Sequence, residues 1–418
     1  MSERKTEVLV VGAGPTGLLT ALMLAEAGID VQIIDGEERT ASRSYACALH
    51  GKTIELLDRC GVAEPILQCG RQVHRIAFYD GESRRAETNF AELGGRFPFL
   101  LVLPQNMLEK ILELRLRERV KVKWNHRFDG FQRQNRDEVV VTVEELEGTA
   151  LGYIVPHWET VVKRQVAIRT QFVVGADGRN SLVRRRLGIE SETSGTPESI
   201  VACEFTAGTV SQNEVRVVMD DMTTNVLWPL SDDKYRWTFQ LIHSEAPVEF
   251  PQKERCSATP GEQVLNKQIR TNLQKLIQHR APWFSGEINE ILWCKQAVFE
   301  HRLARSFGRD RCWLAGDAAH QTGPVGVQSL NAGFGEAEAL AGILKQILRD
   351  EAPLAALENY DRERQNVWRR LLGWTGGLSP NSGHNIWLGR RAARLLSCLP
   401  ASGDDLSRLA GQLGLEFA

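Results

Sequence analysis

The chain places an apolar run directly before a glycine-rich turn, a pattern typical of a dinucleotide-binding βαβ unit. Residues 7–11 are short and apolar, as buried parallel strands are. The turn 12–17 reads GAGPTG and leads into small apolar residues up to 27, which predict a helix. A second apolar run, 31–34, predicts the neighbouring strand. The start of the chain therefore belongs to the α/β class.

The turn contains the glycines that a bound pyrophosphate requires. Gly12 permits the tight turn, Gly14 lets the backbone approach the phosphates, and Gly17 lets helix and strand pack closely. Asp35 ends the second strand, where its carboxylate is placed to accept hydrogen bonds from a ribose diol. The motif predicts a dinucleotide site, but alone it does not separate FAD from NAD.

Two further glycine–aspartate turns follow predicted strands. The first, 175–181, carries Asp177, and the second, 316–320, carries Asp317. Asp317 is followed by a loop and a predicted helix at 331–349. Ligands of α/β folds bind at the carboxyl ends of strands, and a helix start carries partial positive charge. The second turn therefore predicts a site that stabilises an anion, such as a reduced flavin ring.

The middle of the chain changes character. Residues 196–300 hold several strand candidates rich in aromatic and β-branched residues, and 262–280 has helical composition. Because the glycine-rich, apolar composition of the N-terminal region returns from residue 311, we expect a dinucleotide-binding domain interrupted by a sheet domain. The expected regions are a nucleotide-binding domain at 1–75, 100–185 and 300–350, a substrate-binding sheet domain at 76–99 and 186–299, and a helical region at 351–418.

Composition excludes several classes of partner. A net charge of −2 gives no reason to expect nucleic acid. The chain has no apolar run of about 18 residues, as a membrane span needs, and its start lacks signal-peptide regions, so a cytoplasmic location is expected. Eight cysteines are scattered without a CxxC pair, which predicts no metal site and reduced thiols.

The three turns, in this order and spacing, resemble the FAD fingerprint, the DG motif and the GD motif of group A flavoprotein monooxygenases of the para-hydroxybenzoate hydroxylase type. The resemblance covers roughly residues 5–350. It implies a Rossmann-like FAD-binding domain (GR2-type) interleaved with an antiparallel-sheet substrate domain and followed by C-terminal helices.

The resemblance also implies roles for single residues. The ADP half of FAD would be held by Gly12, Gly14, Pro15, Thr16, Gly17 and Asp35, and the pyrophosphate would lie near Arg43. Gln105 would contact the diphosphate or ribityl region, Asp177 would serve FAD and NAD(P)H, and Gly316 and Asp317 would hold the ribityl chain. The flavin would be met by Pro324, Gly326, Val327, Ser329, Leu330 and Asn331. Pro324 would lie near the oxygen-reacting carbon, and the N–H groups of Leu330 and Asn331 would face the pyrimidine carbonyl.

Three positions depart from the pattern that the resemblance implies. Val327 and Ser329 replace glycines, and Glu336 stands where aspartate is commoner. Ser329 is expected to narrow the space over the ring or to alter the mobility of the loop. For His320, inside the GD motif, we expect a structural hydrogen bond rather than proton transfer.

The implied activity is a monooxygenation that uses FAD, NAD(P)H and O2. A flavin C4a-hydroperoxide would hydroxylate or epoxidise an aromatic, quinoid or polyketide-like small molecule. The alternatives are an FAD-dependent reductase of isoprenoid or quinoid compounds, a flavin-dependent halogenase, whose GWxWxIP motif the chain lacks, and a non-catalytic flavin-binding protein. The sequence leaves NADPH against NADH and the substrate open.

Two further stretches are ambiguous. Candidates for the substrate wall are Trp228, Tyr235, Trp237 and Phe239, although core packing is the more frequent role of such aromatic residues. The stretch 386–399 is weakly amphipathic and basic, which suits contact with a membrane surface, but packing on its own domain is the favoured interpretation.

Overall fold

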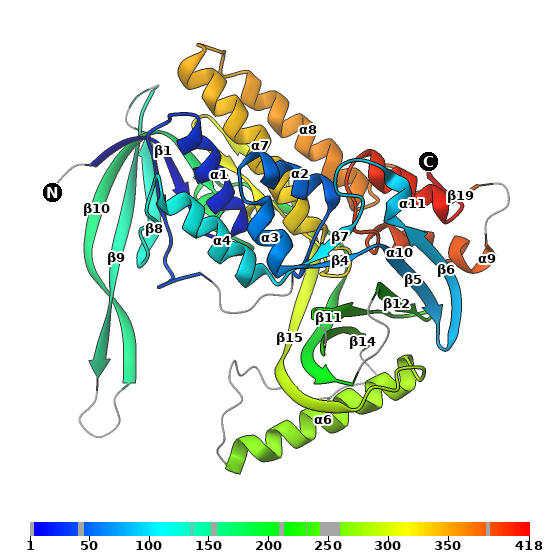
Figure 1. Ribbon diagram of the computed structural model, residues 1–418. Helices are drawn as coiled ribbons and strands as arrows, with labels where there is room; N and C mark the ends of the chain where they lie inside the picture. The colour runs from blue at the N-terminus through cyan, green and yellow to red at the C-terminus, as the bar shows by residue number, and fades with distance from the viewer. Residues whose placement is uncertain are drawn as a thin grey trace.

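Two large β-sheets, each covered by helices, dominate the computed structural model (Figure 1). The structure describes residues 4–40, 46–133, 135, 137–151, 157–208, 213–231, 233–242, 260–381 and 385–418. The mixed α/β fold that the sequence predicts is confirmed.

The first sheet has the strand order β16-β17-β10-β1-β2, with β9 pairing with β10 and β8 pairing with β9. Its strands are β1 (Arg4–Val11), β2 (Val31–Ile34), β8 (His126–Arg133), β9 (Val139–Leu151), β10 (His157–Gly175), β16 (Gly308–Arg309) and β17 (Cys312–Leu314). The strands β1, β10 and β17 are parallel neighbours. Val11 pairs with Gly175, and Gly175 pairs with Leu314, so the three strands end side by side. The glycine–aspartate turns that follow them must therefore emerge at one edge of the sheet.

The second sheet has the strand order β18-β15-β11-β14-β13-β12-β5-β6. Its strands are β5 (Arg75–Asp80), β6 (Ser83–Asn89), β11 (Ser191–Ala207), β12 (Glu214–Met219), β13 (Thr224–Pro229), β14 (Lys234–Leu241), β15 (Ile288–Ala304) and β18 (His320–Gln321). The strand β18 follows directly after the turn at Asp317 and pairs with β15. The two sheets are thus joined at a turn expected to bind the cofactor. A smaller sheet holds β3 (Ala48–Leu49), β4 (Arg71–Val73) and β7 (Leu100–Val102).

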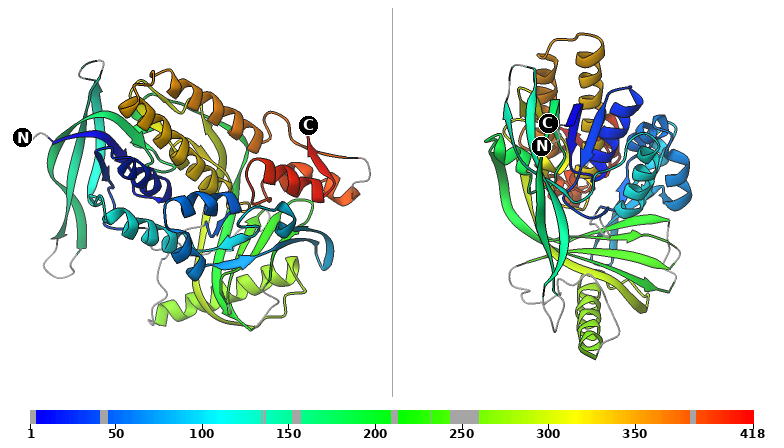
Figure 2. Two further views of the ribbon diagram at one scale, coloured as in Figure 1. Left: turned by 45° about the horizontal axis from the view of Figure 1, so that its top comes forward. Right: turned by 90° about the vertical axis from the view of Figure 1, so that its left-hand side faces the viewer.

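Helices cover both large sheets. They are α1 (Pro15–Glu26), α2 (Gly51–Arg59), α3 (Ala63–Cys69), α4 (Gln105–Arg117), α5 (Leu182–Arg186), α6 (Pro260–Arg280), α7 (Gln328–Arg349), α8 (Ala356–Leu371), α9 (Ile386–Gly389), α10 (Ala392–Leu396) and α11 (Asp404–Gln412). The helix α1 packs against α7 and α4. Figure 2 shows α6 on the far side of the second sheet from α1 and α4.

The C-terminal region differs in part from the expected purely helical one. Besides helices it contains a small sheet of β19 (Leu378–Pro380) and β20 (Leu415–Phe417). In the stretch 386–399, Leu388 and Leu395 are buried, and Arg391 pairs with Asp221 at 2.6 Å. The apolar side of this stretch thus packs on its own chain. Among the described residues, no helix combines the length and apolarity that crossing a bilayer demands.

The expectation of reduced thiols is wrong for one pair of cysteines. Cys203 on β11 and Cys294 on β15 lie opposite each other and form a disulfide. The pairing joins residues 91 positions apart in the sequence, so it depends on the register of two strands that spacing alone does not reveal.

Candidate active site

The first two glycine turns touch through their backbones. A Cβ atom at Gly12, whose φ is +103°, would lie 2.2 Å from the carbonyl oxygen of Ala176, and one at Gly17 would lie 1.9 Å from the carbonyl oxygen of Gly12. The N–H of Ala176 also donates to the carbonyl of Val11 at 2.7 Å. These approaches admit only glycine, and they bring the DG turn against the start of α1.

The third turn meets the same place through Thr16. A Cβ atom at Gly316, whose φ is +67°, or at Gly333 would lie 2.7 Å from Thr16 Oγ1. The helix α7 therefore packs on α1 at the level of the first turn, and the GD turn lies between them. The convergence of the three motifs follows from the common edge of β1, β10 and β17.

A cavity of about 440 Å³ lies where the three turns meet. Its lining residues are Gly14, Pro15, Thr16, Ala46, Gln105, Ala176, Gly178, Arg179, Lys295, Ala297, Phe299, Ala315, Asp317, Gln321, Thr322, Gly323, Pro324, Val327, Ser329 and Leu330. The cavity thus joins all three motifs to a wall from β15.

Asp177 and Asp317 hold different positions in this site. One carboxylate oxygen of Asp177 accepts hydrogen bonds from the N–H groups of Leu182 (2.7 Å) and Val183 (3.1 Å), at the start of α5. Its other oxygen is buried without a hydrogen-bond partner among the described residues. Asp317 opens into the cavity. Desolvation by the surrounding protein disfavours the charged carboxylate and raises the pKa of both carboxyl groups.

Glu336 supports the GD turn from behind. Its buried carboxyl group accepts hydrogen bonds from the N–H of Gly316 (2.7 Å) and from Trp368 Nε1 (2.6 Å), and it contacts His320 Nε2 at 2.9 Å. The ring of His320 also stacks on Trp368 at 3.7 Å. The structural hydrogen bond predicted for His320 is confirmed. Glu336 thus connects the turn at Asp317 to α8.

The loop before α7 is held at several points. The helix begins at Gln328, three residues earlier than expected, so Ser329 and Leu330 lie in its first turn. Val327 caps it with a φ of +54°, a left-handed conformation that costs a β-branched residue about 1–3 kcal/mol. Asn331 Nδ2 donates to the carbonyls of Val327 (2.9 Å) and Ala48 (3.1 Å). The first N–H groups of α7 lack partners within the helix, and Ser329 and Leu330 of this first turn line the cavity.

The predicted site residues fall into distinct groups. Those that line the cavity are Gly14, Pro15, Thr16, Gln105, Asp317, Pro324, Val327, Ser329 and Leu330. Those that shape it without lining it are Gly12, Gly17, Asp35, Asp177, Gly316, Gly326 and Asn331. Asp35 accepts the N–H of Ala13 at 2.6 Å, beside the first turn. Arg43, predicted near the pyrophosphate, lies outside the described residues.

The aromatic candidates for the substrate wall do not line the cavity. Tyr235, Trp237 and Phe239 are buried in the core between the second sheet and α6. Trp228 is also buried, but it belongs to the larger core on the other face of the second sheet from α6. Strand alternation grouped Tyr235, Trp237 and Phe239 correctly, but it does not say which face of a sheet a helix covers.

The wall that faces the motifs comes instead from β15, which the sequence analysis did not single out. Lys295, Ala297 and Phe299 are alternate residues of this strand, so all three point into the cavity. Arg179, two residues after Asp177, lines it as well. The period-two spacing of Lys295, Ala297 and Phe299 is the only signal in the sequence that marks this face.

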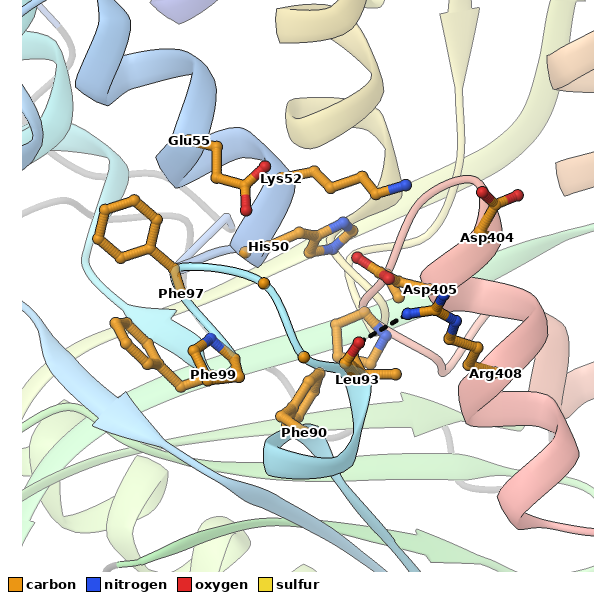
Figure 3. A pocket seen from close by; sticks show the side chains of 16 residues that line it. His50, Lys52, Glu55, Phe90, Leu93, Phe97, Phe99, Asp404, Asp405 and Arg408 are labelled. Carbon is orange, nitrogen blue, oxygen red and sulfur yellow. Dashed lines mark hydrogen bonds between the residues drawn. The ribbon is translucent and has the colours of Figure 1, made fainter.

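A second cavity, of about 190 Å³, lies between the start of α2 and α11 (Figure 3). Lys52, Asp405 and Arg408 lie around it, and the buried His50 forms part of its wall. His50 Nε2 contacts the carbonyl of Gly326 at 3.2 Å, and Nδ1 contacts Ser402 Oγ at 3.1 Å. Since a carbonyl only accepts, Nε2 carries the proton and Nδ1 accepts from Ser402. Burial lowers the pKa of His50 to about 3, so the imidazole is neutral.

The first cavity fits FAD on structural grounds. No atom lies within 4 Å of a Cβ position at Gly14, so the turn is open toward a phosphate at the start of α1. The start of α7 offers a second set of N–H groups, and Asp177 keeps a buried carboxylate oxygen without a described partner. An extended dinucleotide with a flavin ring matches this combination of N–H donors and a carboxylate acceptor.

The chain matches the family described as FAD binding domain over residues 5–375. It is 25% identical over 392 residues to pentachlorophenol 4-monooxygenase of Sphingobium chlorophenolicum, covering 91% of this chain and 65% of that protein. It is 26% identical over 377 residues to para-nitrophenol 4-monooxygenase of Pseudomonas sp. (strain WBC-3), covering 86% and 83%. The chain thus spans about two thirds of the first relative and most of the second.

Solved structures share the fold. That of p-nitrophenol 4-monooxygenase PnpA from Pseudomonas putida DLL-E4 superimposes with a TM-score of 0.72 at 22% identity, covering 99% of this chain and 94% of that one. A ternary complex of aklavinone-11 hydroxylase with FAD and aklavinone gives 0.68 at 23% identity, covering 88% and 67%. The relatives named above are aromatic monooxygenases, which confirms the predicted resemblance to group A flavoprotein monooxygenases. With the match over residues 5–375, the chain belongs to the FAD binding domain family.

Proposed function

We propose that this chain is an FAD-dependent monooxygenase that uses NAD(P)H and O2 to hydroxylate an aromatic, quinoid or polyketide-like small molecule. One observation carries the proposal: three turns from separate parts of the chain border a single cavity whose remaining wall comes from another sheet. Such an arrangement suits a cofactor on one side and a substrate on the other.

Bound FAD supplies the electron transfer and oxygen activation, and the protein binds, orients and shields the reactants. In the proposal, the turn at Gly14 and the start of α1 hold the pyrophosphate, and Asp317 binds the ribityl chain. The N–H groups of Leu330 and Asn331 at the start of α7 would stabilise negative charge on a bound flavin ring. Pro324, which lines the same cavity, would lie against the ring.

The β15 wall defines the substrate class that we propose. Phe299 and Ala297 contribute apolar surface to the cavity, and Lys295 adds a cation on the same strand face. An aromatic compound with an acidic group, such as a phenolate or carboxylate, matches both features.

The direct test is to purify the protein and to measure flavin absorbance, NAD(P)H oxidation and O2 uptake with a panel of phenolic, quinoid and polyketide compounds. We expect a yellow protein, substrate-stimulated O2 uptake and a product that gains one oxygen atom. A protein that stays colourless with added FAD would contradict the cofactor. A yellow protein that oxidises NAD(P)H and reduces a substrate without O2 uptake would identify the reductase alternative.

A further inference from the structure

The loop that leads into α7 is closed at its base by two hydroxyl side chains. Ser329 Oγ accepts a hydrogen bond from the N–H of Thr322 at 3.1 Å and lies 3.3 Å from Thr322 Oγ1. The hydroxyl of Thr322 donates to the carbonyl of Gly323 at 3.2 Å. In the contact between the two hydroxyls, either oxygen can be the donor. Ser329 and Thr322 are therefore joined by two contacts, one of them from the backbone N–H of Thr322.

We propose that Ser329 is a positioning residue whose hydroxyl holds the loop 322–329 in its cofactor-binding shape before FAD arrives. Ser329, Thr322 and Pro324 all line the cavity, so the pair lies within the site itself. Closing the base of the loop fixes the distance between Pro324 and the first N–H groups of α7. The proposal rests on FAD binding, which the family establishes, and is independent of the proposed reaction.

The geometry of the loop explains why such a closure is needed. Val327 stands in a left-handed conformation that persists only where the surrounding contacts over-determine it. His50 holds the tip of the loop at the carbonyl of Gly326, and Asn331 holds its end at the carbonyl of Val327. Neither contact reaches Thr322, where the loop begins. The Ser329 hydroxyl joins that beginning to the end of the loop.

Glycine, which the resemblance leads one to expect at position 329, has no group that forms this closure. The loop of this chain therefore loses its freedom during folding rather than during cofactor binding. A preformed site binds more tightly because less conformational entropy is lost on association. The contribution of the hydroxyl should accordingly be visible in FAD affinity and in the exchange of the Thr322 amide hydrogen.

The test compares Ser329→Ala with the unaltered full-length protein, with and without bound FAD. We expect faster hydrogen exchange at the Thr322 amide in the FAD-free variant and an FAD dissociation constant raised about 2- to 13-fold, the range for one hydrogen bond. Fluorescence quenching of FAD gives the affinity, and visible circular dichroism reports the surroundings of the ring. Ser379→Ala, which removes a hydroxyl from β19 outside the cavity, is the matched control.

Two further variants separate positioning from general destabilisation. Ser329→Thr keeps the hydroxyl and should keep the FAD affinity. Thr322→Val keeps the N–H donor, so its FAD affinity should lie between those of Ser329→Ala and the unaltered protein. Unchanged exchange at Thr322 in Ser329→Ala would overturn the proposal. Unchanged FAD affinity with faster exchange would also overturn it, because the closure would then not serve the cofactor. Equal losses in Ser329→Thr and Ser329→Ala would show that the hydroxyl is not the cause.

Discussion

A Cβ atom placed on Gly12 would lie 2.2 Å from the carbonyl oxygen of Ala176, so the cofactor turn and the DG turn are in backbone contact. By contrast, a Cβ atom on Gly14, two residues later, would meet nothing within 4 Å. The fold therefore requires glycine at position 12. At position 14 the fold tolerates a side chain, so we expect that glycine there leaves space for a bound phosphate.

This contrast predicts opposite outcomes for two similar substitutions. Gly12→Ala should destabilise the protein by about 4 kcal/mol or more, because neither backbone can move away without breaking the sheet edge. Gly14→Ala should melt near the temperature of the unaltered protein but lose bound flavin, because its methyl group occupies phosphate space. Thermal unfolding and flavin absorbance per chain measure the two effects. Loss of stability in Gly14→Ala would refute this division of roles.

Asp317 should control flavin content. Asp317→Ala removes a carboxylate that opens into the cavity, and loss of a charged hydrogen bond weakens binding about 10- to 100-fold. Trp237→Phe is the control, because Trp237 is buried in the core against α6, away from the cavity. Flavin occupancy after gel filtration distinguishes the two. Full occupancy in Asp317→Ala would show that the GD turn does not bind the cofactor.

Glu336 should act on stability and cofactor together. Glu336→Leu leaves the N–H groups of Gly316, Trp368 and His320 without an acceptor, and each unsatisfied buried group costs about 1–3 kcal/mol. Glu336→Gln keeps the size and part of the accepting capacity, so it should be milder. Urea unfolding with and without FAD measures both variants. Equal stability of Glu336→Leu and the unaltered protein would contradict the supporting role of Glu336.

His50 should make stability depend on pH. Its pKa is about 3 in the folded protein against an ordinary value of 6.5, so below pH 6.5 the unfolded chain takes up a proton that the folded chain refuses. Stability is therefore lost as the pH falls from about 6.5 toward 3. The advantage of the unaltered protein over His50→Leu should shrink by about 2 kcal/mol between pH 7 and pH 5.

The control for this effect is His50→Gln, which keeps a donor toward the carbonyl of Gly326 but does not titrate. It should show the same pH dependence as His50→Leu while retaining more FAD. Denaturant unfolding at pH 7, 6 and 5 provides the comparison. A constant stability difference across this range would show that folding does not lower the pKa of His50.

Lys295 should decide the preference among substrates. Lys295→Met keeps the length of the side chain and removes its charge. For a phenolic acid we expect kcat/KM to fall about 10-fold or more, the loss of a charge-assisted contact, while a neutral phenol is affected little. Steady-state O2 uptake with matched acidic and neutral substrates measures this. Equal losses for both would place Lys295 outside substrate recognition.

The sequence was informative where function depends on backbone shape. Gly12, Gly17 and Gly316 occupy positions that only glycine tolerates, and such requirements are written locally in the chain. The strand predicted at 31–34 matches β2 residue for residue, because a short apolar run is a local signal.

The substrate wall could not be read in the same way. Alternation placed Tyr235, Trp237 and Phe239 on one face, but only the position of α6 decides that this face is core. The disulfide between Cys203 and Cys294 likewise depends on strand register. The Ser329–Thr322 contact joins the two ends of a loop whose path has no periodic signal. In each case the missing information is a tertiary relationship.

The short strand β18 begins three residues after Asp317 and is hydrogen-bonded to β15, where the N–H of Ala304 also donates to the carbonyl of Ala319 at 2.6 Å. The turn at Asp317 and the cavity wall on β15 are thus linked by backbone hydrogen bonds within one sheet. If β15 forms the substrate wall as proposed, replacing its side chains should change which compounds fit, while the distance between this wall and the GD turn stays constant. The proposed enzyme could therefore change its substrate without moving the cofactor site relative to the substrate wall.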